Sequence, residues 1–200
     1  MQYLQTYERF LHTYEQYLNQ ENKLNDHLLT LYHSSPASNL TSILSHGLKI
    51  NPPSKNYIEL PYTPKYVQSL YSDYAPDFFS GIPVFLSKNP NLFRETSVDA
   101  TLRVDCSNLP RTTDIPRFQD ILKRIGEVTL YKQGFHISAS DDLPSDIKSL
   151  IDGAGIISIE RLLRDEKYVQ VAFKYCQTLA VLSDIEPARI KVCYIPKHKK

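Results

Sequence analysis

The chain has 200 residues, of which 42% are hydrophobic, so it can bury one compact core and is sized for a single domain. Its 23 basic and 22 acidic side chains give a formal net charge of +1, which excludes a global field that would steer it to nucleic acid or to a membrane. Three cysteines, Cys106, Cys176 and Cys193, lack C-x-x-C spacing. This argues against a disulfide scaffold and a metal site, and predicts buried thiols in a reducing compartment.

Residues 1–27 have the pattern of an amphipathic helix. Its apolar side chains recur at spacings of three and four, at Leu4, Tyr7, Leu11, Tyr14 and Leu18. We expect this helix to cover the sheet of the domain formed by residues 28–200, although it is also a candidate regulatory or dimerising element. No signal peptide and no apolar run long enough to span a bilayer is visible, which predicts a cytoplasmic protein without membrane contact.

The next segment predicts a short buried strand from Leu28 to His33, followed by a helix. Ser35 is the expected cap of that helix, with Pro36 at its first position, and Gly47 is expected to end it. The expected buried stripe consists of Leu40, Ile43 and Leu44. His33 would then leave a strand beside hydroxyls and free helix-start amides, a set of donors that suits ribose hydroxyls and phosphates.

The pattern Tyr-His-x-Ser followed by Asn-Leu-x-Ser-Ile-Leu-x-x-Gly-Leu spans Tyr32 to Leu48. It resembles the opening of the ADP-ribosyltransferase fold, and specifically of the DNA ADP-ribosyltransferase toxins of the DarT type. The resemblance implies that NAD is the substrate and that the first wall of its site contains His33, Ser34, Ser35 and Asn39. His33 would hold the adenosine-side ribose or its phosphate. The same local sequence pattern also joins a strand to a helix in proteins without any such site.

The segment from Asn51 to Gly81 is rich in proline and tyrosine and predicts a long loop with a short helix near residues 65–71. Long loops inside compact domains are usually functional or disordered, and the aromatic content argues against disorder. The resemblance implies that this segment lies over the NAD site, so a tyrosine such as Tyr66 would stack on adenine or nicotinamide. Alternatively, the tyrosines only fix the loop to the surface.

A second block, Ile82 to Phe93, predicts a buried strand followed by a Ser-Lys-Asn-Pro turn. It resembles the second strand of the same family, which forms the other wall of the nicotinamide pocket. Phe85 falls where many relatives carry tyrosine, and Ser87 where a serine or threonine is often found. These two residues are therefore further candidates for contact with NAD.

The middle of the chain alternates strands and helices without a strict β-α-β repeat, which indicates an α+β fold. The expected strands are residues 100–105, 127–131, 134–137 and 156–157, and the expected helices are residues 115–125, 141–151 and 158–164. With the resemblance, the expected architecture is an ADP-ribosyltransferase-like split β-sheet core with helices, preceded by the amphipathic helix.

A third block, Tyr175 to Ile190, resembles the closing strand of the family and its I-x-P-x-x-I tail. In the family this strand begins with a catalytic glutamate, and that position falls on Thr178, with Gln177 beside it. A neutral side chain orients a ribose hydroxyl but does not supply negative charge to a developing cation. Three alternatives remain. Gln177 takes the place of the glutamate, as glutamine does in some members of the fold; an acid from elsewhere in the chain takes it; or the catalytic activity has been lost. The acids near in sequence are Glu160, Asp165 and Glu166.

The resemblance implies an enzyme that cleaves the nicotinamide glycosidic bond of NAD and transfers ADP-ribose, without a metal. A DNA base is the first acceptor to test, with RNA or protein behind it. One alternative is a degenerate member of the fold that binds a nucleotide, nucleic acid or partner protein without turnover. Another is an RNA 2′-phosphotransferase, whose histidine and Ile-Leu-x-x-Gly-Leu block is similar but whose arginine-bearing blocks are absent here.

Overall fold

The computed structural model describes residues 30–50, 64–73, 81–92, 99–131, 133–138 and 143–196. The helix expected over residues 1–27 lies outside the described residues, and so does the boundary of the following domain. The side chain of Tyr66 also lies outside them, although the backbone of Tyr66 belongs to a described helix.

The described residues form an α+β fold, as the sequence predicts, and their strands make two antiparallel sheets. The larger sheet has six strands in the order β4-β8-β2-β1-β3-β9, and the smaller has three in the order β5-β6-β7. The strands of the larger sheet are β1 (Thr30–Pro36), β2 (Val84–Ser87), β3 (Asp99–Asp105), β4 (Arg111–Thr113), β8 (Thr178–Val181) and β9 (Ile190–Tyr194). Those of the smaller sheet are β5 (Val128–Tyr131), β6 (Gly134–Ile137) and β7 (Ile156–Ser158).

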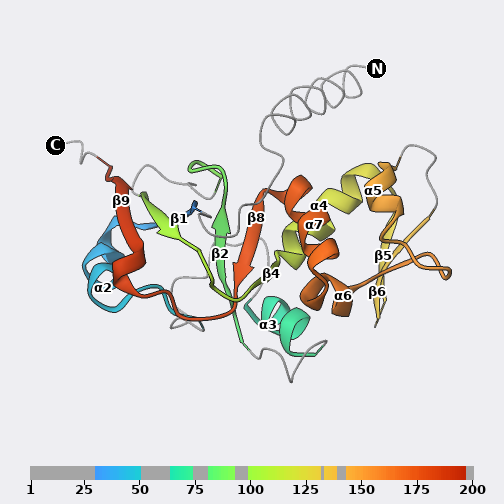
Figure 1. The fold of residues 1–200 in the computed structure, drawn as a ribbon, viewed down its shortest axis with the longest axis horizontal. Coiled ribbons are helices and arrows are strands. Elements are labelled where there is room, and N and C mark those ends of the chain that lie inside the picture. Colours follow the sequence, from blue (N-terminus) through green and yellow to red (C-terminus); the bar gives the residue numbers. More distant parts are fainter. Residues whose placement is uncertain are drawn as a thin grey trace, which may run out of the picture.

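The helices gather around and between the sheets. They are α2 (Leu40–His46), α3 (Pro64–Ser72), α4 (Ile115–Ile125), α5 (Ser145–Lys148), α6 (Ile159–Arg164) and α7 (Glu166–Cys176), with 3-10 turns η2 (Ala37–Asn39) and η4 (Pro187–Arg189). Figure 1 shows the six-stranded sheet on the left, the three-stranded sheet on the right, and α4, α6 and α7 between them. No helix of the described residues has the length and apolar character needed to cross a bilayer.

Two clusters of buried side chains stabilise these layers. One contains Leu31, Leu86 and Leu179 from β1, β2 and β8, together with Ile43 of α2. The other is built mainly by α4, α6 and α7 and includes Ala180 of β8. Neighbouring residues of a strand point to opposite faces, so β8 contributes to both clusters and all of its residues are buried.

Helix α4 shows how closely some local patterns determine structure. Asp114 caps it by accepting a hydrogen bond from the backbone N–H of Arg117, and Pro116 occupies its first turn. Phe118 and Leu122 are buried on one face. The predicted helix over residues 115–125 is therefore confirmed, and so are the strand at residues 100–105 and the short helix near residues 65–71.

The connection after β1 differs from the expectation. The strand continues to Pro36 and α2 begins only at Leu40, so Ser35 does not cap a helix. Leu44 is 45% exposed, so its predicted place in the buried stripe is wrong. Gly47 ends α2 as predicted, with φ of 81°, and a Cβ there would clash with the carbonyl oxygen of Ile185.

The second half of the chain also differs from the expectation in several places. Helix α7, which the sequence analysis did not predict, contains Tyr175 and Cys176 and ends directly before the closing strand. The helix expected to reach Ile151 ends at Lys148, because Ser149 to Ile151 form turns. Residues 134–137 pair within the smaller sheet, and Cys193 is exposed rather than buried.

Candidate functional site

The three sequence blocks that resemble the ADP-ribosyltransferase fold lie on three adjacent strands, β1, β2 and β8. Strand β2 lies between the other two and pairs antiparallel with both. Tyr32 of β1 is opposite Ser87 of β2, and Ser87 is opposite Thr178 of β8. Directly opposite residues point to the same face of a sheet, so these three side chains form a polar row across it.

The contact between β1 and β2 is short. These two fully described strands pair at Tyr32 and Ser87 alone, whereas β1 pairs with β3 along its whole length. Beyond that point the ring of His33 bridges the strands, with its Nδ1 3.1 Å from the carbonyl oxygen of Phe85. A side chain therefore replaces part of the backbone ladder between the first two blocks.

The hydrogen bond to Phe85 determines what His33 offers to a ligand. A carbonyl oxygen only accepts, so Nδ1 carries the hydrogen and donates. Burial lowers the pKa of His33, and this hydrogen bond opposes the effect, so the ring is neutral at pH 7. Its Nε2 is then an acceptor, which suits a ribose hydroxyl better than a phosphate oxygen.

The candidate residues divide between the two faces of the sheet. His33 and Ser35 share the face of Leu31, which we call the His33 face, because residues two apart in a strand point to the same side. Ser34 is on the opposite face with Thr178, which we call the Thr178 face, and Phe85 lies opposite Ala180 on that same face. The candidate residues of the first block are therefore not all on one side of the sheet.

Several candidates on the two walls also have local partners. On the His33 face, Asn39 Nδ2 donates to Ser35 Oγ at 3.4 Å. On the Thr178 face, Ser87 is fully buried and its Oγ accepts a hydrogen bond from the backbone N–H of Asn89 at 2.9 Å. The half-buried ring of Phe85 meets Tyr71 edge-on, with 6.3 Å between centroids. Each of these contacts also gives its residue a structural role that does not require a ligand.

Gln177 has an unusual backbone. It ends α7 in the left-handed region with φ of 55°, and its N–H donates to the carbonyl of Phe173 at 2.8 Å. Its own carbonyl accepts from the N–H of Lys88 at 2.7 Å, which joins the start of β8 to the end of β2. Left-handed backbone costs a residue with a side chain about 1 kcal/mol, and Gln177 is half-exposed beside the polar row.

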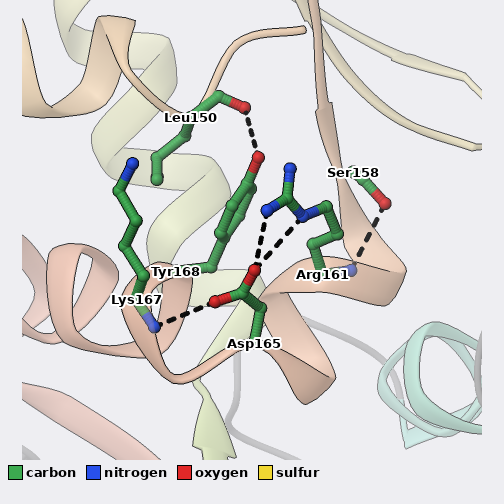
Figure 2. Close-up of polar contacts among 6 residues, drawn as sticks. All are labelled: Leu150, Ser158, Arg161, Asp165, Lys167 and Tyr168. Carbon is green, nitrogen blue, oxygen red and sulfur yellow. Dashed lines mark hydrogen bonds and ion pairs between the residues drawn. The ribbon is translucent and has the colours of Figure 1, made fainter.

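The acids that are nearest in sequence are not near Thr178. Asp165 caps the start of α7, where it accepts from the N–H of Lys167 at 3.0 Å and pairs with Arg161 at 2.8 Å (Figure 2). That start is separated from Gln177 by the length of α7, about 16 Å at 1.5 Å per residue. Glu166 belongs to the first turn of α7, and Glu160, in the first turn of α6, pairs with Arg164 at 3.9 Å and has a side chain that is 66% exposed. None of the three supplies charge at the polar row.

The acid beside Thr178 is Asp114, which the sequence analysis did not select. It follows β4, whose Thr113 is opposite Leu179, so Asp114 comes next in register, beside Thr178. Burial raises the pKa of Asp114 to about 6, against the opposing effects of Thr178 and the Arg117 N–H. The sequence signal for Asp114 was only that of a helix cap, because its neighbour β8 is remote along the chain.

No group of three or more potential ligands that would hold a metal ion occurs within the described residues. Comparisons with protein-family models, with curated protein sequences and with solved structures found no match.

Proposed function

We propose that the chain is an NAD-dependent mono-ADP-ribosyltransferase-like protein whose site lies where β1 and β2 separate. The observation that carries the proposal is the order of the strands. Blocks that resemble three separate parts of the family occupy β1, β2 and β8, which are neighbours in one sheet. Blocks that matched the family only by chance would have no reason to become adjacent.

The proposed roles follow from the chemistry of each side chain. Nε2 of neutral His33 accepts a hydrogen bond from a hydroxyl of the adenosine-side ribose. The half-exposed ring of Phe85 contacts nicotinamide, and Ser34 lies on the same face. Gln177 and Thr178 lie toward the nicotinamide ribose, where amide and hydroxyl groups orient its hydroxyls.

The proposed reaction breaks the bond between nicotinamide nitrogen and the ribose carbon. The electron pair of that bond leaves with nicotinamide, and the ribose carbon acquires positive charge. An acceptor nucleophile then forms the new bond and releases a proton. A DNA base is the first acceptor to test, followed by RNA and protein.

A second candidate function is binding without turnover. Ser87 and Thr178 are buried to within 1% exposure, and neither Gln177 nor Thr178 is an acid. These observations favour a degenerate member of the fold that binds a nucleotide, a nucleic acid or a partner protein. The two candidates differ in one product, free nicotinamide.

The test is calorimetric titration of the purified chain with NAD, followed by measurement of released nicotinamide. We expect binding, release, and at least a tenfold loss of affinity in His33→Ala, because a buried hydrogen-bond partner is lost. The matched control is His46→Ala, an exposed histidine whose Nδ1 bonds within α2 to the carbonyl of Ser42. Binding without release would favour the degenerate protein. Unchanged affinity in His33→Ala would refute the assignment of His33.

A further inference from the structure

The buried polar atoms near the start of α4 are unusually poor in partners. Within the described residues, the buried side-chain atoms without a hydrogen bond are those of Thr113, Arg117, Thr178 and Ser183. Thr113 precedes Asp114 in sequence, Thr178 lies beside it in register, and Arg117 donates its backbone N–H to the Asp114 carboxylate. Buried polar groups are normally paired, and unpaired ones concentrate where a ligand or a reaction requires them.

The environment of Asp114 differs from that of an ordinary helix cap. It is 4% exposed, whereas a helix cap can stay at the surface and keep its carboxylate in water. Tyr71 of α3, Arg117 and Asp120 of α4, and Cys176 of α7 all act on it electrostatically. We call Tyr71, Asp114, Arg117, Cys176 and Thr178 the Asp114 cluster. Arg117 is the cation within it.

Thr178 connects this cluster to the polar row. Its hydroxyl stabilises the ionised form of Asp114, yet its geometry does not make a regular hydrogen bond to any described residue. A hydroxyl has one hydrogen to donate and lone pairs that accept. If the hydrogen is directed to the Asp114 carboxylate, the lone pairs remain available to a hydroxyl of a bound ribose.

We infer that Asp114 is a positioning residue that supplies, through Thr178, the negative charge that the closing strand itself lacks. This inference rests on the proposed function. The carboxylate forms no bond and moves no proton in the reaction. It polarises the Thr178 hydroxyl, which accepts a hydrogen bond from the nicotinamide ribose while the glycosidic electron pair leaves with nicotinamide. In a buried site little water screens such a charge, so it stabilises the cationic ribose strongly.

The test compares Asp114→Asn with the wild-type chain in NAD affinity and in the rate of nicotinamide release across pH 4.5 to 8. Asparagine keeps the cap, because its side-chain oxygen still accepts from the Arg117 N–H. We expect NAD affinity within threefold of wild type and release slowed about 100-fold at pH 7.5. The wild-type rate should fall below pH 6 as Asp114 gains a proton, and the variant should lack this acid limb.

Two further variants guard against a purely structural effect. Thr178→Val removes only the hydroxyl, and we expect it to slow release about as much as Asp114→Asn, with no additional loss in the double variant. This variant also tests the inference if Asp114→Asn does not fold. The control is Asp165→Asn, the same change at the cap of α7, which should leave the rate unchanged.

The outcomes separate this inference from the proposed function. A wild-type chain that does not bind NAD would overturn the proposed function itself. A wild-type chain that binds NAD but releases no nicotinamide would overturn the inference, because the charge would then serve no bond cleavage. Release by Asp114→Asn at the wild-type rate, with the acid limb retained, would overturn the inference and leave the proposed function intact.

Discussion

Helix α7 begins and ends in two contrasting regions. At its start the polar groups are paired and open to water: Asp165 pairs with Arg161, and the Arg161 guanidinium lies 4.2 Å from the centre of the Tyr168 ring (Figure 2). At its end Gln177 has left-handed backbone and the buried Thr178 hydroxyl lacks a regular hydrogen bond. One helix thus joins a region that satisfies its polar groups to one that does not.

Two helix caps make the contrast quantitative. Asp165 and Asp114 both accept hydrogen bonds from the first turn of a helix. The Arg161 guanidinium holds the pKa of Asp165 below its usual value, whereas burial raises the pKa of Asp114 to about 6. Burying a carboxylate with too few partners destabilises a protein, and such strain is typical of functional sites. The difference between the two caps therefore favours the end of α7, and not its start, as the place of a functional site.

The largest expected effect is on the pH dependence of stability. The folded state raises the pKa of Asp114 from 3.8 to about 6, so its contribution to stability is fully present below 3.8 and is lost as pH rises through 6. Relative to wild type, the free energy of unfolding of Asp114→Asn should therefore increase by about 3 kcal/mol between pH 3 and pH 7. Urea unfolding at several pH values measures this.

Asp165→Asn should behave in the opposite sense in the same experiment. Its lowered pKa contributes stability above the unfolded value, and this contribution is lost as pH falls. The variant should therefore be less stable than wild type at pH 7, with the difference shrinking toward acid pH.

One outcome would contradict the expectation for Asp114. Parallel curves of unfolding free energy against pH for the wild-type chain and Asp114→Asn would mean that burial does not destabilise the Asp114 carboxylate, and the contrast between the two caps would fail.

A smaller effect is expected from removing one hydroxyl in each region. Tyr71 donates to the carbonyl of Thr113 at 2.9 Å and accepts from the N–H of Ile115 at 3.2 Å, next to Asp114. Tyr71→Phe leaves both buried backbone groups without this partner and should cost about 2 kcal/mol of unfolding free energy. Tyr168→Phe leaves one buried backbone group, the carbonyl of Leu150, without its donor and should cost about 1 kcal/mol.

Thermal melts of the two variants give the comparison directly. The phenylalanine ring fills nearly the same space, so packing is kept and the difference reports on the hydroxyl partners. Equal losses in Tyr71→Phe and Tyr168→Phe would show that the second hydrogen bond of Tyr71, from the N–H of Ile115, adds nothing to stability. A larger loss in Tyr168→Phe would show that the start of α7 depends more strongly on its tyrosine hydroxyl than the surroundings of Asp114 do.

The sequence predicted the elements that local rules determine. The apolar spacing and the Asp-x-Pro start of α4 define its bounds without any tertiary information. The same rules failed at Leu44, whose exposure depends on what packs beside α2, and at α7, whose C-terminal turn reads equally well as the first residues of a strand. Local pattern does not specify which side of a helix finds a partner.

The candidate site was predictable only in part. The residues of the three blocks were found because they resemble a family, and their strands are adjacent in the sheet. Asp114 was missed because its importance arises from the pairing of β4 with β8 and from burial, neither of which a single sequence displays. Its local pattern was fully explained by a helix cap, so nothing called for a second role.

The smallest expected effect concerns the backbone at the end of α7. Gln177 has φ of 55°, a conformation that glycine adopts without cost. Gln177→Gly should raise the free energy of unfolding by up to about 1 kcal/mol, as measured by urea unfolding at pH 7. If the amide of Gln177 also orients a ribose, the same variant should bind NAD more weakly, so stability and affinity should change in opposite directions.

The matched control is Asn108→Gly. Within the described residues, Asn108 is the other non-glycine residue with a positive φ, which is 60°. Asparagine tolerates this conformation, so its replacement should change stability by only a few tenths of a kcal/mol and leave NAD affinity unchanged. If Gln177→Gly destabilised the chain, the glutamine side chain would contribute packing that outweighs the strain. Gln177 would then have a structural role at this position. The end of α7 would be stabilised by its side chains, as the start of α7 is, and the contrast between the two ends would be smaller.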